Sequence, residues 1–210
     1  ASTRGLDVVY VRRLFSEKYA IVNAGFDLSE AATADVMTAE GAQGTDYAST
    51  GWKIGQTAAW SNGAVIAYGS TTKLNNESIP QTDNAGHGGN ALAITVGWSG
   101  TTTYQSAEPI ELPAGTYTLM AYAYNANGSA QQMQSKLGFV STSGTEYISS
   151  ANSYLSNKWN IDYVTFTLTE ATEGRFQVGG TAISGGSGAN AKVFFANLQL
   201  VVKLPVAHEV

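Results

Sequence analysis

The strongest constraint on this chain is the strict alternation of apolar and small side chains in residues 89–100, GNALAITVGWSG. Leu92, Ile94, Val96 and Trp98 fall on one face of this segment, and Ala, Thr and Gly residues fall on the other. A period of two is typical of a β-strand with one buried face. The parity places Trp98 with the core side chains, so we expect it to pack. The alternative is that Trp98 offers a flat surface on which a ligand stacks.

Three later segments alternate in the same way and predict strands with one aliphatic face and one aromatic or polar face. In residues 117–124 the first face holds Tyr117, Leu119, Ala121 and Ala123, and the second holds Met120, Tyr122 and Tyr124. In residues 161–168 the first face holds Asp162, Val164, Phe166 and Leu168, and the second holds Ile161, Tyr163, Thr165 and Thr167. In residues 193–200 the faces are Phe194, Ala196, Leu198 and Leu200 against Val193, Phe195, Asn197 and Gln199.

Turn signals separate these short segments. Ser61-Asn62-Gly63 predicts a tight hairpin, and further turns are expected at residues 113–115 and 127–128. Residues 18–27 predict a short strand that runs into a turn, and residues 28–50 predict a surface loop with one helical turn near Ser29. Many short strands without a long helix after Thr50 predict an all-β sandwich or barrel.

Composition narrows the function classes. The chain has 210 residues, which suits one β-sandwich domain. It has no cysteine, which excludes disulfides, thiolate metal sites and a cysteine nucleophile. Its net charge of -5 argues against nucleic-acid binding. No apolar run reaches the roughly 20 residues of a membrane span, and residues 1–9 lack the apolar core of a signal peptide. The low share of charged residues, 13%, suits an exported bacterial β-protein.

Several motifs together resemble a recurrent domain of exported Bacteroidetes proteins, a jelly-roll of the galactose-binding-like type. They are VNAGFD at residues 22–27, VGW at 96–98, TYQ at 103–105, LPAGTYTL at 112–119, AYN at 123–125, LTEATEGRFQVG at 168–179 and VFFANLQL at 193–200. The resemblance covers residues 20–202. It implies a jelly-roll β-sandwich, preceded by an irregular N-terminal extension (1–19) and followed by a C-terminal tail (203–210).

The resemblance also implies an exported location (periplasm, outer-membrane surface or extracellular space), often within polysaccharide-utilisation machinery. Relatives of this fold are commonly carbohydrate-binding modules, and many hold a structural calcium between the first and last strands. In that pattern Asp27 supplies one oxygen ligand. The closing strand has Ala196 where an Asp is usual, which leaves Asn197 beside it as the second candidate. The alternative is that Asp27 caps a turn. No other cofactor is expected.

Catalytic motifs are missing from the sequence. His87 and His208 have no partner at metal-ligand spacing, and there is no nucleophile elbow. The residues 185–190 are rich in glycine but lack the lysine and helix of a phosphate-binding loop. A glycosidase needs two carboxylates across a cleft. The sixteen acidic residues are scattered along the chain, so we expect a protein that is not an enzyme, with a glycan-active jelly-roll enzyme as the weakest alternative.

Aromatic residues are the candidate ligand contacts, because a flat ring matches the apolar face of a sugar ring. Trp52 and Trp98 are expected in the core. Trp60 and Trp159 adjoin turns or polar loops and are expected at a rim. The predicted ligand-binding residues are Trp60, Trp159, Tyr122, Tyr124 and Tyr154. The predicted function is non-catalytic binding of a polysaccharide or glycan. The alternative is a structural or adhesin-like domain that contacts another surface protein.

Overall fold

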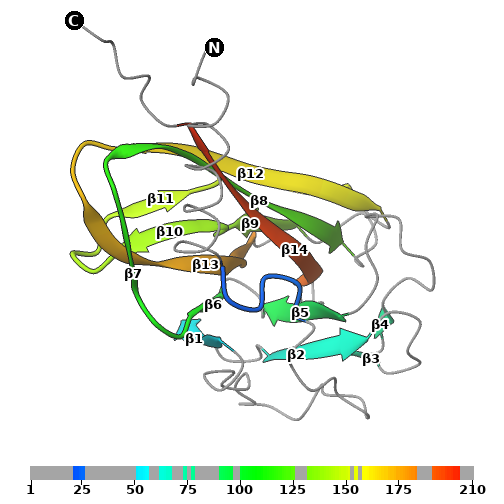
Figure 1. The fold of residues 1–210 in the computed structure, drawn as a ribbon. Coiled ribbons are helices and arrows are strands. Elements are labelled where there is room, and N and C mark those ends of the chain that lie inside the picture. Colours follow the sequence, from blue (N-terminus) through cyan, green and yellow to red (C-terminus); the bar gives the residue numbers. More distant parts are fainter. Residues whose placement is uncertain are drawn as a thin grey trace, which may run out of the picture.

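The computed structural model describes residues 21–26, 51–56, 62–67, 73–74, 77–78, 90–96, 100–125, 132–151, 154–155, 158–183 and 191–203. Across these residues the chain forms strands and no helix. Two antiparallel sheets pack face to face, and β3 (Lys73–Leu74) and β4 (Glu77–Ser78) form a separate two-stranded ladder beside β2 (Asn62–Ala67) (Figure 1). The predicted all-β jelly-roll sandwich is confirmed. The proposed extension, residues 1–19, lies outside the described residues.

The five-stranded sheet has the order β12-β8-β14-β5-β2. Its strands are β12 (Trp159–Leu168), β8 (Gly115–Asn125), β14 (Ala191–Lys203), β5 (Asn90–Val96) and β2 (Asn62–Ala67). The strand β8 lies between β12 and β14 in this sheet. It pairs with β12 over ten residues without a register shift and with β14 on its other side.

The seven-stranded sheet has the order β1-β6-β13-β10-β11, and β7 and β9 also pair with β13. Its strands are β1 (Trp52–Gln56), β6 (Thr101–Ser106), β7 (Ile110–Leu112), β9 (Gln132–Ser135), β10 (Gly138–Ser141), β11 (Glu146–Ile148) and β13 (Thr172–Ile183). The chain crosses repeatedly between the sheets, so neighbouring strands in sequence often belong to different layers.

The main core lies between the two sheets and follows the predicted parity. In β8 the residues Tyr117, Leu119, Ala121 and Ala123 are buried, whereas the residues between them are half-buried. In β12 the buried residues Asp162, Phe166 and Leu168 alternate with exposed ones. The predicted burial of Trp52 is confirmed: the ring is fully buried, lies 5.4 Å from the ring of Phe26 and donates a hydrogen bond from Nε1 to the carbonyl of Asn23.

A second, smaller cluster lies on the opposite face of the five-stranded sheet. Its buried members are Ala91 and Ala93 of β5 and Phe194 and Ala196 of β14. The strand β5 is therefore buried on both faces, since Leu92, Ile94 and Val96 belong to the main core. Trp98, which the same alternation assigns to the core, lies outside the described residues.

The strict alternation predicted for residues 193–200 is wrong beyond Ala196. A β-bulge between Ala196 and Gln199 shifts the register, and Asn197 there has a φ of 49°. Phe194 and Ala196 face away from the main core, but Leu198 is part of it. One extra residue in the strand reverses the parity of everything after it.

The predicted hairpin at Ser61-Asn62-Gly63 is also wrong. Asn62 and Gly63 are the first residues of β2, which pairs with β5, whereas β1 pairs with β6 in the other sheet. The chain changes sheets between β1 and β2, and local turn propensity does not reveal this change. The predicted turn at residues 113–115 is confirmed as the connection between β7 and β8. The turn at 127–128 and the helical turn near Ser29 lie outside the described residues.

A buried carboxylate holds β12 to the opposite layer. Asp162 is 3% exposed and accepts hydrogen bonds from the hydroxyls of Ser135 (2.5 Å), Ser149 (2.5 Å) and Tyr154 (2.6 Å). The serine Oγ atoms in turn accept the backbone N–H groups of Leu137 and Ala151. Unpaired, a buried carboxylate is very costly, and three hydroxyl donors offset that cost. The cluster thereby ties β12 to the segments 135–137 and 149–151.

The same cluster changes the pKa of the Tyr154 hydroxyl. Burial raises the pKa of the Tyr154 hydroxyl well above its usual value, and the negative charge and hydrogen bond of Asp162 raise it further. The native state therefore holds this proton more tightly than the unfolded chain does. The protonated Tyr154 hydroxyl therefore stabilises the fold in full below pH about 10, the pKa of an unperturbed tyrosine. This stabilisation is lost as the pH rises through the raised pKa of the folded state.

We predict that Tyr154→Phe lowers the free energy of unfolding by about 1–3 kcal/mol at pH 7, because Asp162 stays buried with one donor fewer. The variant is also expected to lose less additional stability than the parent above pH about 10. Urea unfolding at several pH values measures both effects. The exposed Tyr163 gives the control, Tyr163→Phe, expected to change stability by less than about 0.5 kcal/mol. Equal stability of Tyr154→Phe and parent at all pH values would contradict the prediction.

Candidate functional site

The outer face of the five-stranded sheet collects the aromatic side chains that the core excludes. The register sets Trp159 opposite Tyr124, Ile161 opposite Tyr122, and Tyr163 opposite Met120 across β12 and β8. On the other side of β8, the register continues to Phe194 opposite Tyr124 and Ala196 opposite Tyr122. Side chains that are directly opposite on one face lie in contact range. The strands β12 and β8 thus present one continuous surface, and β14 beside them (Figure 1) adds the fully buried Phe194 and Ala196.

One end of this surface is aromatic. The rings of Tyr124 and Trp159 lie 5.5 Å apart with a 58° tilt, and Tyr124 lies 6.2 Å from Phe194. Phe194 is fully buried, whereas Tyr122, Tyr124 and Trp159 are half-buried and pack against the second cluster. Packing on Phe194 and the alanines fixes the orientation of these three rings. We call Trp159, Tyr122 and Tyr124 the aromatic patch.

The surface becomes open in its middle. Ile161 is 59% exposed and Tyr163 is 61% exposed, and both project from β12 beside the aromatic patch. Large apolar groups with such exposure, next to a fixed aromatic cluster, are typical of a contact surface for a ligand or another protein.

On β12 and β8 the other end of the surface is polar and uncharged, and the register sets Lys203 of β14 opposite Thr116. Two hydroxyl pairs bridge β8 and β12: Thr118 with Thr165 at 2.9 Å, and Thr116 with Thr167 at 3.0 Å. Each hydroxyl can donate one hydrogen bond and accept two, so a paired threonine still has capacity for a bound hydroxyl group. Stacking surface and hydrogen-bonding groups therefore follow one another along a single strand pair.

Three of the five predicted ligand contacts come together in the aromatic patch: Trp159, Tyr122 and Tyr124. Tyr154 does not join them. It is 6% exposed, faces the main core and is held by Asp162, so its burial speaks against a stacking role. Trp60 lies outside the described residues. The ligand-binding role of all five residues stays a prediction.

The sequence set omitted Tyr163, the most exposed aromatic residue of this face. The alternation of residues 161–168 already placed Tyr163 outward with Ile161. In the sequence, aromatic residues were predicted at a rim because they adjoin a turn or a polar loop. Tyr163 lies in the middle of a strand and does not meet this criterion. Only the register with β8 shows that it adjoins the aromatic patch.

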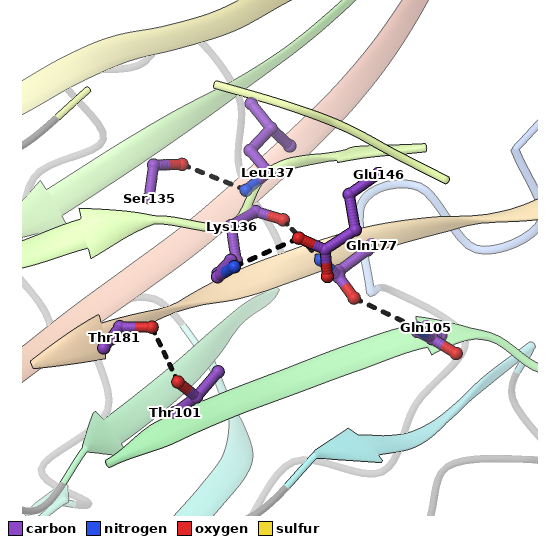
Figure 2. A network of polar contacts seen from close by, with 8 residues as sticks. All are labelled: Thr101, Gln105, Ser135, Lys136, Leu137, Glu146, Gln177 and Thr181. Atoms are coloured by element: carbon purple, nitrogen blue, oxygen red, sulfur yellow. Dashed lines mark hydrogen bonds and ion pairs between the residues drawn. The ribbon is translucent and has the colours of Figure 1, made fainter. Parts of the chain in front are cut away.

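The seven-stranded sheet carries a different, purely polar row (Figure 2). Gln105 donates to Gln177 at 3.0 Å, and Gln177 donates to the carbonyl of Lys136 at 2.9 Å. Thr101 and Thr181 pair at 2.6 Å, and Lys136 forms an ion pair with Glu146 at 3.1 Å. This row has amides and hydroxyls but no aromatic ring. It lacks the stacking surface that the aromatic patch has.

Of the two predicted calcium ligands, the structure describes Asn197. The turn 21–26 lies against the bulge of β14, since the Leu198 N–H donates to the carbonyl of Ala24 at 3.0 Å. Asn197 is therefore next to the chain segment that leads to Asp27, but Asp27 itself lies outside the described residues. No group of three or more His, Cys, Asp or Glu side chains capable of holding a metal occurs among the described residues.

No family model and no curated protein matches the sequence. Solved structures with a similar fold include β-sandwich carbohydrate-binding modules. A family 61 module, TmCBM61, in complex with β-1,4-galactotriose has a TM-score of 0.45 and 15% identity, over 86% of this chain and 96% of that one. The xylan-binding CBM22-1 domain from Paenibacillus barcinonensis Xyn10C has a TM-score of 0.45 and 13% identity, over 82% and 97%.

The similar solved structures also include an enzyme. The arabinose-bound α-L-arabinofuranosidase MgGH51 has a TM-score of 0.47 and 18% identity over 81% of this chain. This chain spans only 25% of that enzyme's length. None of the described residues forms a helix long and apolar enough to cross a membrane.

Proposed function

We propose that this chain is a non-catalytic carbohydrate-binding module and that the aromatic patch with Tyr163 is its ligand-binding surface. The single observation that carries the proposal is that oriented aromatic rings and paired threonine hydroxyl groups lie on one face. A sugar ring presents C–H groups on its faces and hydroxyls around its edge. Trp159, Tyr124 and Tyr163 suit the faces, and the threonine pairs suit the hydroxyls.

The ligand class follows from the charge of this surface. The outward residues of β12 and β8 are aromatic, aliphatic or hydroxylated, and none of them is charged. A neutral glycan needs no counter-charge, whereas an acidic glycan would need lysine or arginine. The surface extends over about ten residues of β12, roughly 30 Å, which is long enough for several sugar units of an extended chain.

The same surface supports binding without hydrolysis. Glycoside hydrolysis needs two carboxyl groups that flank the scissile bond. Asp162 is the one acidic residue of β12, and it points inward and is engaged by three hydroxyls. The proposal of an exported, surface-attached module of polysaccharide-utilising bacteria draws on the sequence resemblance and on the low charge content of the chain.

We predict that the parent binds a neutral polysaccharide on a glycan array and that Trp159→Ala and Tyr124→Ala each weaken binding by about tenfold or more, or 1.4 kcal/mol, through loss of stacking area. Isothermal titration calorimetry with the best array ligand measures the loss. Gln105→Ala, which removes a polar group from the other sheet, is the control and is expected to bind as the parent does.

Thermal unfolding of each variant separates loss of binding from loss of fold, because Trp159 is also a packing residue. Tyr163→Ala provides a second route, since its exposed ring contributes little to stability. A folded parent that binds no glycan, or patch variants that bind as tightly as the parent, would refute the proposed function.

We also propose a structural calcium ion held by Asp27 and Asn197 beside the turn 21–26. Backbone carbonyls of this turn and the Asn197 amide offer the hard oxygen atoms that calcium prefers. Calcium at 100 times its dissociation constant is predicted to stabilise the fold by about 2.7 kcal/mol, seen as a higher melting temperature than in chelator. Asp27→Ala is expected to abolish this shift, whereas Glu146→Ala keeps it. Identical melting of the parent with calcium and with chelator would contradict the site.

A further inference from the structure

We propose that the free edge of β12 is a self-association surface, at which β12 pairs antiparallel with β12 of a second copy. Because β12 is the terminal strand of the five-stranded sheet, one side pairs with β8 (Figure 1). No other strand of the described residues pairs with its second side. A strand edge in this state presents a row of backbone donors and acceptors to any extended chain.

The strand lacks the features by which edges are usually blocked. Residues 159–168, WNIDYVTFTL, contain no lysine, arginine, glutamate, proline or glycine. The one charged residue, Asp162, is buried in the core. The register with β8 has no bulge over ten residues. Natural edges more often carry charges, prolines or bulges, which prevent pairing with another chain.

Edges of the seven-stranded sheet show the contrast. The strand β1 is five residues long, carries Lys53 and has a register irregularity between Ile54 and Gln56. The strand β11 is three residues long and begins with Glu146, which is paired with Lys136. Both of these edge strands are short and carry charged side chains. Of the three edge strands β1, β11 and β12, only β12 is long and has no charged side chain that points outward.

A hollow adjoins the middle of β12 and is lined by residues 148–151 and residues 161–165. The side chains beside it are Ile161 and Tyr163, each about 60% exposed, and the exposed Thr165. An incoming strand would pack beside these side chains and satisfy the backbone of the edge at once, with their outer faces left open.

The partner we infer for this edge is a second copy of this chain. Because each copy carries a net charge of -5, two copies repel where acidic residues meet, so a self-association surface has to be free of acidic side chains. The outward side chains of β12 are neutral and contribute no repulsion. An antiparallel pair of identical strands also has the two-fold symmetry of the commonest oligomers.

Parity and the position of the hollow select the register. In an antiparallel pair, residues directly opposite each other face the same side of the sheet. Outward residues of β12 have odd numbers, so they oppose odd-numbered residues of the copy. Residues 161–165 of β12 line the hollow, and we place the middle one of them, Tyr163, opposite its own copy. Ile161 then lies opposite Thr165, and Trp159 lies opposite Thr167.

This pairing would join the two five-stranded sheets into one continuous sheet. Trp159 and its copy would lie eight residues apart along the strands, about 27 Å, on the same face. If the proposed function holds, the dimer presents two aromatic patches to one glycan chain and gains avidity from the second contact. The self-association itself does not depend on glycan binding.

Sedimentation equilibrium over a range of protein concentrations tests the proposal. The parent is expected to form a dimer, and Thr165→Lys is expected to remain monomeric at concentrations where the parent is dimeric, by at least a tenfold weaker association. Thr118→Lys is the matched control. It loses the same threonine–threonine hydrogen bond and gains the same charge, but on β8 away from the edge, and is expected to dimerise.

A single introduced cysteine tests the register, because the chain has no cysteine of its own. Tyr163→Cys is expected to form a disulfide-linked dimer under mild oxidation, and Thr118→Cys is expected to stay unlinked. A folded parent that is monomeric at every concentration would overturn the proposal. So would a dimer that persists unchanged in Thr165→Lys, since that dimer uses another surface. Glycan binding by a monomeric parent would leave the proposed function standing while this inference fails.

Discussion

The alternation of side chains along β8 is the constraint on which the rest of the structure depends. This strand is paired on both sides, with β12 and with β14, so its parity fixes the faces of both neighbours. The main core requires Tyr117, Leu119 and Ala121 to point inward. Tyr122 and Tyr124 must then point outward, where Trp159 and Phe194 meet them. The aromatic patch is thus a consequence of the same pattern that builds the core.

The buried carboxylate of Asp162 stabilises β12, the edge strand of the five-stranded sheet. Edge strands tend to fray, and within the described part of the chain β12 has a partner strand on one side only. Asp162 offsets this by binding three hydroxyls, two of which come from segments of the other layer. The carboxylate points inward between Ile161 and Tyr163, which point outward. Rigid anchoring of the inward residues keeps the exposed residues in place, and a preorganised surface loses less entropy when it binds.

The sequence was sufficient for features that depend on local periodicity. The faces of residues 117–124 and 161–168, the burial of Trp52 and the all-β class all follow from a period of two. It was insufficient where one residue or one long-range pairing decides the outcome. Nothing local marks the bulge at Asn197, which returns Leu198 to the core. The Asn62-Gly63 pair has the chemistry of a hairpin, but β2 finds its partner in β5.

The candidate site was predictable to a similar degree. Residues from two distant segments, 122–124 and 159, were individually recognised as aromatic candidates. Their adjacency depends on the register of β8 with β12. Tyr154 illustrates the limit of such reasoning, because its hydroxyl satisfies a buried carboxylate eight residues away in sequence. A tyrosine that completes a buried polar cluster has the same sequence signature as one that is displayed on the surface.

The measurement that tests this account most directly is the mapping of amide chemical-shift changes by NMR as a neutral oligosaccharide is added. The account predicts that the largest changes cluster on Trp159, Ile161 and Tyr163 of β12 and on Tyr122 and Tyr124 of β8, with the indole N–H of Trp159 among them. Changes centred instead on Gln105 and Gln177 of the seven-stranded sheet would contradict it, because the ligand would then occupy the polar row rather than the aromatic patch.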